Sequence, residues 1–477
     1  GITKEGQTWV GWNTIADSSD TLGAKVLKEA GYATGIVGKL HCLSIPESRK
    51  YEFDGKLSPE DPKNKEIFIK QQEVLARGAK EFGFDFGAAL TSGNLNRKQM
   101  HNPEYQTKCC IDFINKNKSR PFYLYFAPHI MHMPNPLVAL KSADTRNVYG
   151  VMLDEASDVQ PSRTSVLERV REAGINEMLA PITWLDDSVG ALVRTLKELG
   201  IADSTLIILA QDNGHHFGKG SNYEGGIDIL GCWMHWPDGI VNPGRINEAL
   251  IENIDFMPTI FEACGVIPGD DYIMDGKSLV PILRGERENV RDSLMCEIGH
   301  TRAVVTKKWK YLALRVPSSH ELDEALKARY MELAKDDPSL DPLGRVTHIH
   351  SLLGGTPGER VNGIKHHPHY FDRDQLYDLE NDPEEQINLA KESKYASVLA
   401  DMKNLLKEHM HRAPGTFAEF KTFEGLPPKE RAEWMGLAGR SKWKGVRSDT
   451  ESLRTAKKRS RELSRKQDEM KKIFDIK

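Results

Sequence analysis

The chain has 477 residues, of which 39% are hydrophobic and 28% are charged, and its formal net charge is -4 at pH 7. This composition is ordinary for a globular protein with more than one domain, and the weak negative charge does not favour a nucleic-acid partner. No apolar stretch is long enough for a membrane helix, so we expect no membrane span.

Three segments share one pattern, in which a helix, a short turn and an apolar strand lead into polar residues. The helices are expected within residues 20–31, 105–118 and 181–200, and the strands within residues 32–37, 122–127 and 205–210. Helices that alternate with fully apolar strands predict an α/β fold with a mostly parallel central sheet and helices on both faces.

Polar side chains follow each of the three strands. They are Lys39 and His41, then His129 and His132, then Asp212 and Asn213. Ligands of parallel α/β sheets bind at the carboxyl ends of the strands, so the three clusters are expected to share one site. Taken singly, each residue is more often a surface or core residue, and one of the two histidines before Pro134 is a candidate for a core histidine. The Asn213-Gly214 pair is by itself a common turn signal.

The chemistry of these side chains suits an oxyanion held by a hard cation. Adjacent carboxylate and amide oxygens are ligands for Ca²⁺ or Mg²⁺ rather than Zn²⁺. A P-loop is excluded, because Gly214 and Gly218 are one residue too close together and Lys219 is followed by glycine. A tetrahedral oxyanion needs cationic donors around its oxygens and an acid for its leaving group. The set that meets this need is Lys39, His41, His132, Asp212, Asn213 and Lys219.

Downstream of about residue 300 the pattern predicts a smaller α+β subdomain with an antiparallel sheet. Residues 301–316 indicate two strands around a Lys-Lys turn, residues 375–390 a strand, a turn and a helix start, and residues 394–411 an amphipathic helix. The expected domains are an α/β domain over 1–298, this subdomain over 299–412, and a charged tail over 413–477 that is helical or partly disordered.

Two His-rich segments, at residues 348–355 and 365–371, raise the question of a second metal site. Their neighbours lack carboxylates at useful spacing, so surface loops are the better interpretation.

Several segments resemble the sulfatase family of the alkaline-phosphatase-like superfamily. Residues 31–41 resemble the family's GYxTGxxGKWH segment, with Leu40 in place of Trp, and residues 122–134 resemble the strand that leads to a His-x-Pro sulfate-binding motif. Residues 212–214 resemble the metal-binding DNG, and residues 218–226 resemble GKGTxYEGG. Further matches lie at residues 255–259, 275–279 and 376–384.

The resemblance implies hydrolysis of a sulfate ester or sulfamate, with Ca²⁺ and a formylglycine nucleophile. The substrate would be a sulfated small molecule or glycan, and the location periplasmic or secreted. The Ca²⁺ ligands implied by the motif are Asp212 and Asn213.

The remaining roles implied by the resemblance belong to cationic side chains. Lys39 and Lys219 would hold sulfate oxygens, and His132 would contact sulfate and favour departure of the leaving group. His41 would position or deprotonate the formylglycine diol, and His129 and His215 have weaker claims.

One part of the family pattern is not found in the sequence. The formylglycine arises from the Cys or Ser of a C/S-x-P-x-R segment upstream of the GKWH segment, where an Asp-Asp pair also binds the metal. The 38 residues before Lys39 contain neither, and residues 42–49 have the wrong spacing and the wrong place. We therefore expect a fragment truncated at its N-terminus, which cannot turn over sulfate esters alone.

Two other interpretations stay open. A phosphodiesterase or phosphonate hydrolase of the same superfamily would share the sheet and the metal end, although the GKGSNYEGG segment favours sulfate. A non-catalytic protein that binds sulfated glycans is the leading alternative if the chain is full length.

Overall fold

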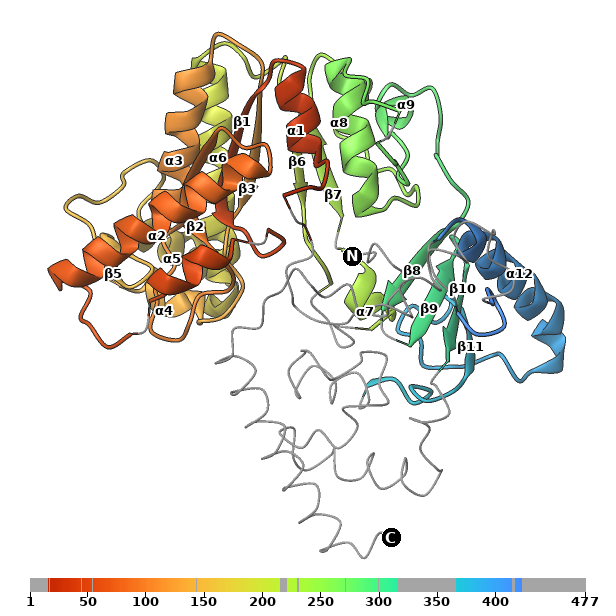
Figure 1. Cartoon of the computed structure of the whole chain (residues 1–477). Helices are drawn as coiled ribbons and strands as arrows, with labels where there is room; N and C mark the ends of the chain where they lie inside the picture. Colours follow the sequence, from red (N-terminus) through yellow and green to blue (C-terminus); the bar gives the residue numbers. More distant parts are fainter. Residues whose placement is uncertain are drawn as a thin grey trace, which may run out of the picture. The chain divides into compact units, whose positions relative to one another are not determined.

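The computed structural model describes residues 16, 18–43, 45–53, 55–142, 144–214, 221–229, 231–270, 272–298, 300–315, 366–413 and 417–422. The chain forms two compact units, one of Gly1–Thr3 with Gln7–Arg412 and one of Lys4–Gly6 with Ala413–Lys477. The expected tail over residues 413–477 lies almost wholly outside the described residues. In its described part, Phe417 and Lys421 form an isolated antiparallel bridge. All helices and strands discussed below belong to the first unit (Figure 1).

A three-stranded parallel sheet with the order β2-β1-β3 lies at the centre of the α/β part. Its strands are β1 (Ala33–Lys39), β2 (Phe86–Thr91) and β3 (Phe122–Ala127). Gly35 of β1 lies opposite Phe86 on one side and Leu124 on the other. The α/β fold with a parallel central sheet, predicted from the alternating pattern, is confirmed.

Helices cover both faces of this sheet (Figure 1). They are α1 (Gly23–Glu29), α2 (Pro62–Glu81), α3 (Pro103–Asn117) and α6 (Ala180–Glu198). Successive side chains of a strand point to opposite faces, and β1 shows this clearly. Ile36 packs with Ala24 of α1 and Leu75 of α2, whereas Val37 packs with Cys110 of α3. The strand is apolar throughout because both of its faces are buried.

Helices α2 and α3 begin where their sequences satisfy the free backbone N–H groups. Asp61 accepts a hydrogen bond from the backbone N–H of Lys63, and Asn102 accepts one from Tyr105. A proline follows each cap at the first helical position, where its missing N–H costs nothing.

The third apolar strand forms where it was expected but does not join the parallel sheet. Strand β6 (Ile207–Ala210) is hydrogen-bonded in antiparallel fashion to β7 (Cys232–His235). Ile207 still packs in the same hydrophobic cluster as Ala33 of β1 and Phe113 of α3. The start of β6 is therefore attached to the central layer by side-chain packing.

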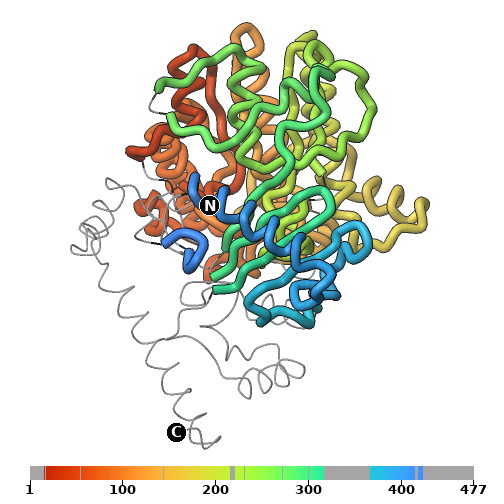
Figure 2. Tube along the Cα trace, turned by 90° about the vertical axis from the view of Figure 1, so that its right-hand side faces the viewer, coloured from red at the N-terminus to blue at the C-terminus, as the bar shows by residue number. Residues whose placement is uncertain are grey.

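A four-stranded antiparallel sheet with the order β11-β10-β9-β8 forms the C-terminal part of the first unit. Its strands are β8 (Leu294–Ile298), β9 (Thr301–Val305), β10 (Trp309–Leu314) and β11 (Asp374–Asp378). Helix α12 (Ala396–Arg412) packs on β8, β9 and β10 (Figure 2). Its buried residues Met402, Leu406 and Met410 are four apart, so they form one face of the helix.

The helix start expected before residue 390 is wrong, because side chains bind the backbone there instead. The Asp382 carboxylate accepts hydrogen bonds from the N–H groups of Gln386 and Ile387. The Asn388 side chain accepts a hydrogen bond from the N–H of Leu376, in the middle of β11, over 3.0 Å. These bonds stabilise an irregular turn rather than a helix.

The remaining elements are short. They are η1 (Pro46–Tyr51), α4 (Pro136–Leu140), β4 (Asn147–Val148), β5 (Val151–Met152), α5 (Arg163–Glu172), η2 (Glu177–Leu179), α7 (Glu224–Ile227), η3 (Asn253–Asp255), α8 (Phe256–Cys264), α9 (Val280–Leu283) and η5 (Ser393–Tyr395). Within the described residues, we find no helix with both the length and the apolar character that a membrane span needs.

Replacing Leu406 with alanine tests how α12 is attached to the C-terminal sheet. Leu406 is fully buried, so we expect Leu406→Ala to lower the free energy of unfolding by about 2–5 kcal/mol, measured by urea denaturation. The exposed neighbour Lys407 provides the control, since Lys407→Ala should have little effect. Equal effects of the two changes would contradict the packing described here.

Candidate active site

Lys39 and His41 lie at the carboxyl end of β1. Lys39 is the last residue of the strand and lies opposite Thr91 of β2, and the N–H of Leu40 donates to the Thr91 carbonyl over 2.9 Å. A Cβ placed on Gly93 would lie 4.0 Å from the Cδ2 atom of His41. The His41 ring therefore lies beside the loop that follows β2.

Gly38 allows β1 and β3 to stay paired up to their ends. It lies opposite Ala127 and has a φ of 102°, and a Cβ there would come within 2.0 Å of the Ala127 carbonyl oxygen. A residue with a side chain would force the strands apart. The close approach brings the residues that follow β1 and β3 to the same edge of the sheet.

His129, just after β3, is buried at this edge and held by two side chains. Its Nε2 atom lies 2.6 Å from the Thr91 hydroxyl, and its Nδ1 atom lies 3.1 Å from the Gln106 amide nitrogen. The Thr91 hydroxyl donates to the Gly93 carbonyl, so it accepts from the imidazole, and Nε2 carries the proton. His129 thereby links β2, α3 and the loop after β3.

The pKa of His129 is lowered to about 3, first by burial and then by electrostatic interactions with His101, Lys39 and His132. His129 is therefore neutral at ordinary pH and supports the site without titrating. Lys39 is paired with Thr91, and the N–H of His132 donates to the His129 carbonyl over 3.1 Å, so both residues lie at the same edge of the sheet.

His132 lies in a turn that His101 holds by hydrogen bonds to its backbone. The Nε2 atom of His101 lies 3.1 Å from the carbonyl oxygen of His132 and 2.8 Å from that of Pro134. Two carbonyl acceptors require a proton on that nitrogen. His101 is buried, and burial lowers its pKa. Sequence patterns did not indicate His101, because it precedes α3 and belongs to none of the strand-end clusters.

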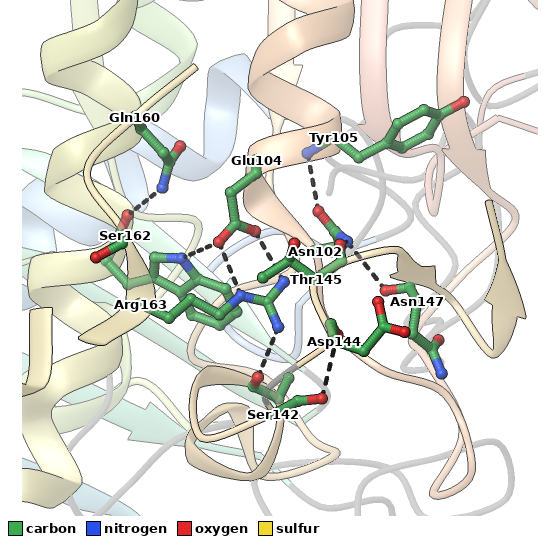
Figure 3. A network of polar contacts seen from close by, with 12 residues as sticks. Asn102, Glu104, Tyr105, Ser142, Asp144, Thr145, Asn147, Gln160, Ser162 and Arg163 are labelled. Carbon is green, nitrogen blue, oxygen red and sulfur yellow. Dashed lines mark hydrogen bonds and ion pairs between the residues drawn. The ribbon is translucent and has the colours of Figure 1, made fainter. Parts of the chain in front are cut away.

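A buried ion pair fixes the segment that follows His132 (Figure 3). Arg163 of α5 contacts both oxygens of Glu104 on α3, at 2.8 and 3.0 Å, and donates to the Ala139 carbonyl at the end of α4. The indole N–H of Trp184 donates to Glu104 as well. Both charges have several hydrogen bonds, as buried charges need. The pair connects α3, α4, α5 and α6 behind the His132 turn.

Asp212 and Asn213 follow β6. Asp212 is exposed. The Asn213 Oδ1 atom is buried without a hydrogen-bond partner within the described part of the chain. Gly214 then donates to the Gly226 carbonyl, 3.1 Å away.

These two residues fit a hard cation in donor type. A buried amide oxygen that accepts no hydrogen bond suits a metal ligand, and an exposed carboxylate beside it suits Ca²⁺. Ca²⁺ takes six to eight oxygens, so Asp212 and Asn213 would hold one side of it. The described residues contain no group of three or more His, Cys, Asp or Glu side chains suited to a metal.

One predicted site residue, Lys219, lies outside the described residues.

Tyr223, in the described segment that follows Lys219, is fully buried. Its ring stacks on His367 at 3.6 Å and 4°. The prediction of a surface loop is therefore wrong for His367, a buried histidine of the second His-rich segment. An aromatic partner 144 positions away gave no signal in the local sequence pattern.

The arrangement of a parallel sheet with helices and a C-terminal antiparallel sheet is that of the alkaline-phosphatase-like sulfatase fold. A solved structure of a Bacteroides thetaiotaomicron protein, from a core genetic locus for the metabolism of multiple glycosaminoglycans, shares it with a TM-score of 0.52 and 19% identity, over 84% of each chain. Ps i-CgsB, solved in complex with k-i-k-neocarrahexaose, has a TM-score of 0.50 and 17% identity over 92% of this chain and 82% of its own.

The chain belongs to the sulfatase family, since residues 7–266 match the family model described as Sulfatase. It is 24% identical to steryl-sulfatase of Rattus norvegicus over 63% of this chain and 47% of the relative. It is 27% identical to human N-acetylgalactosamine-6-sulfatase over 56% and 49%, and 28% identical to human arylsulfatase A over 51% and 46%. The chain spans about half the length of these curated relatives.

The prediction of a chain truncated before the nucleophile gains no support from these matches, because the family match already begins at residue 7. The prediction that the chain is inactive for that reason gains none either.

The buried state of His129 predicts a pH-dependent stability. A histidine that stays neutral in the folded state while the unfolded state takes up a proton loses stability as pH falls from about 6.5 towards 3. Between pH 6.5 and 5 this group should cost about 2 kcal/mol of unfolding free energy. Urea denaturation at both pH values should show a smaller loss for His129→Gln than for the wild type. An equal loss in both proteins would contradict the assignment.

The ion pair behind the His132 turn predicts a large effect of a single change. Arg163→Met leaves the Glu104 carboxylate buried without its partner, so we expect a loss of about 3–5 kcal/mol in unfolding free energy. Arg171→Met, on an exposed position of α5, is the matched control and should be nearly neutral. A loss below 1 kcal/mol for Arg163→Met, on the order of a surface ion pair, would show that the pair is not buried in solution.

Proposed function

We propose that this site binds a sulfate ester for hydrolysis. The observation that carries the proposal is that Lys39 and His132 both lie next to the buried His129. Lys39 is paired with Thr91, whose hydroxyl contacts the His129 ring, and the N–H of His132 donates to the His129 carbonyl over 3.1 Å. A lysine and a histidine at the carboxyl edge of an α/β sheet suit a tetrahedral anion. Membership of the sulfatase family supports sulfate as that anion.

The roles proposed for the chain's own residues follow their chemistry. The Lys39 ammonium donates to sulfate oxygens, and Lys219 is proposed as a second donor. His132 lies at the sulfate and gives a proton to the leaving oxygen, and His41 positions the nucleophile or takes its proton. His129 stays neutral, which keeps a third positive charge away from Lys39 and His132.

Asp212 and Asn213 are proposed as ligands of Ca²⁺. When bound, the ion would neutralise charge on the sulfate and on the attacking oxygen. The proposed nucleophile is a formylglycine hydrate. Its C/S-x-P-x-R segment does not occur in the 477 residues, so these residues are proposed to carry only part of the active site and to be inactive alone.

The proposed substrate class is a sulfated small molecule or glycan. Relatives of the chain are named as steryl-sulfatase and N-acetylgalactosamine-6-sulfatase, and a protein with the same fold was solved with a neocarrahexaose. These names cover both apolar and carbohydrate esters, and the location proposed from the resemblance is periplasmic or secreted.

The binding test described below also distinguishes two other functions. A phosphodiesterase or phosphonate hydrolase of the same superfamily would select a phosphate ester at this edge. A non-catalytic member of the family would bind sulfated glycans and turn over none of them.

Binding of 4-nitrophenyl sulfate in the presence of Ca²⁺, measured by calorimetry, tests the proposal. We expect Lys39→Ala and His132→Ala each to weaken binding about tenfold or more, since each removes a charged hydrogen-bond donor. Lys80→Ala, an exposed lysine on α2, is the control and should bind like the wild type.

Tighter binding of bis-4-nitrophenyl phosphate than of the sulfate ester would favour the phosphodiesterase. Binding that is unchanged in both variants would contradict the proposed site. Turnover of 4-nitrophenyl sulfate by the 477 residues would disprove the expectation that they are inactive alone.

A further inference from the structure

A buried lysine of the C-terminal sheet has none of the functional roles proposed above. Lys310, on β10, has no exposed side-chain surface. Its ammonium lies 2.8 Å from the Glu224 carboxylate on α7 and 2.7 Å from the Glu385 carboxylate. A buried ammonium is retained only where counter-charges offset its loss of water, and here two carboxylates do so.

The Glu385 side chain completes this buried ion cluster of Lys310, Glu224 and Glu385. Its second carboxylate oxygen accepts the backbone N–H of Glu224 over 2.6 Å. Glu385 is fully buried and has a φ of 57°, which non-glycine residues rarely adopt. Burial raises its pKa to about 7 against the attraction of Lys310. The carboxylate of Glu385, whose backbone is strained, therefore contacts the first residue of α7.

The residues just before Glu224 contact the same sheet. The Asn222 amide donates to the Thr301 hydroxyl of β9 over 3.0 Å. The Tyr223 hydroxyl donates to the Gln375 side chain of β11 over 2.9 Å. Three consecutive side chains, of residues 222–224, are thus held by three strands of the antiparallel sheet.

The held segment is in turn bonded to the turn that carries Asn213. The N–H of Gly226 donates to the Tyr223 carbonyl over 2.8 Å, and the Gly226 carbonyl accepts from the N–H of Gly214 over 3.1 Å. A Cβ on Gly214 would meet the Gly225 carbonyl oxygen at 2.5 Å. The two backbones are therefore in direct contact next to the Asn213 oxygen.

We propose that Lys310 is a positioning residue for the Asp212–Asn213 turn, acting through Glu224, Glu385 and the Gly226–Gly214 hydrogen bond. The inference rests on the proposed function in one respect, namely that this turn binds Ca²⁺. In this proposal, the C-terminal sheet fixes the position and orientation of the proposed metal ligands at the edge of the α/β part.

Hydrogen–deuterium exchange of the metal-free protein tests the coupling without any activity. We expect Lys310→Met to speed exchange of the Gly214 amide about tenfold or more relative to the amides of β1. Lys308→Met is the matched control, because the Lys308 side chain is 41% exposed and pairs with Glu380 at the surface, so it should leave Gly214 unchanged.

The double variant Lys310→Met with Glu385→Gln keeps the test valid if the single variant unfolds. It removes one buried carboxylate together with the ammonium, and glutamine still offers an oxygen to the Glu224 N–H, so the protein should fold. Faster exchange confined to Gly214 and residues 222–228 is expected. Unchanged exchange at Gly214, or an equal rise in β1, would overturn the proposal.

Calorimetric titration with CaCl₂ supplies the second readout. In the double variant we expect Ca²⁺ to bind about tenfold more weakly than in the wild type. Unchanged affinity together with faster exchange would overturn the link to the metal end. If the wild type binds no Ca²⁺ while Gly214 still responds, the coupling stands and the proposed function fails.

Discussion

A lysine ammonium without exposed surface can stay in a protein only beside opposite charges, and Lys310 meets that condition with two carboxylates. One of them, Glu224, lies within the segment 218–226 that resembles the sulfatase GKGTxYEGG, and the other, Glu385, lies in the turn after β11. The ion cluster therefore ties the C-terminal antiparallel sheet to the backbone beside Asn213. In our proposal, the position of the Asp212–Asn213 turn follows from this constraint.

The opposite end of the site is supported by a neutral group instead of a charged one. His129 stays uncharged mainly because it is buried. Through its contact with Thr91 it joins the ends of β2 and β3. Lys39 and His132 thus lie beside a rigid, uncharged support. In the proposed function, an anion that binds there would meet Lys39 and His132 beside a buried, hydrogen-bonded histidine, which is the kind of preorganisation that catalysis on charged esters uses.

The sequence predicted the fold and the strand-end clusters, because periodicity and strand ends are local features. Lys39 and His132 could be chosen because each follows an apolar strand. The supporting residues could not, since their partners are distant. In the sequence, Lys310 looks like an ordinary lysine of a strand, because its partner Glu224 is 86 positions away. The antiparallel partner of β6 and the Asn388 turn were missed for the same reason, because long-range backbone and side-chain hydrogen bonds leave no periodic pattern.

A crystal structure of the chain with Ca²⁺ and 4-nitrophenyl sulfate would test the central claim most directly. We expect the ion at about 2.3–2.6 Å from the side-chain oxygens of Asp212 and Asn213, with the sulfate group in contact with Lys39 and His132. An ion or a sulfate bound elsewhere, with these four side chains unengaged, would contradict it.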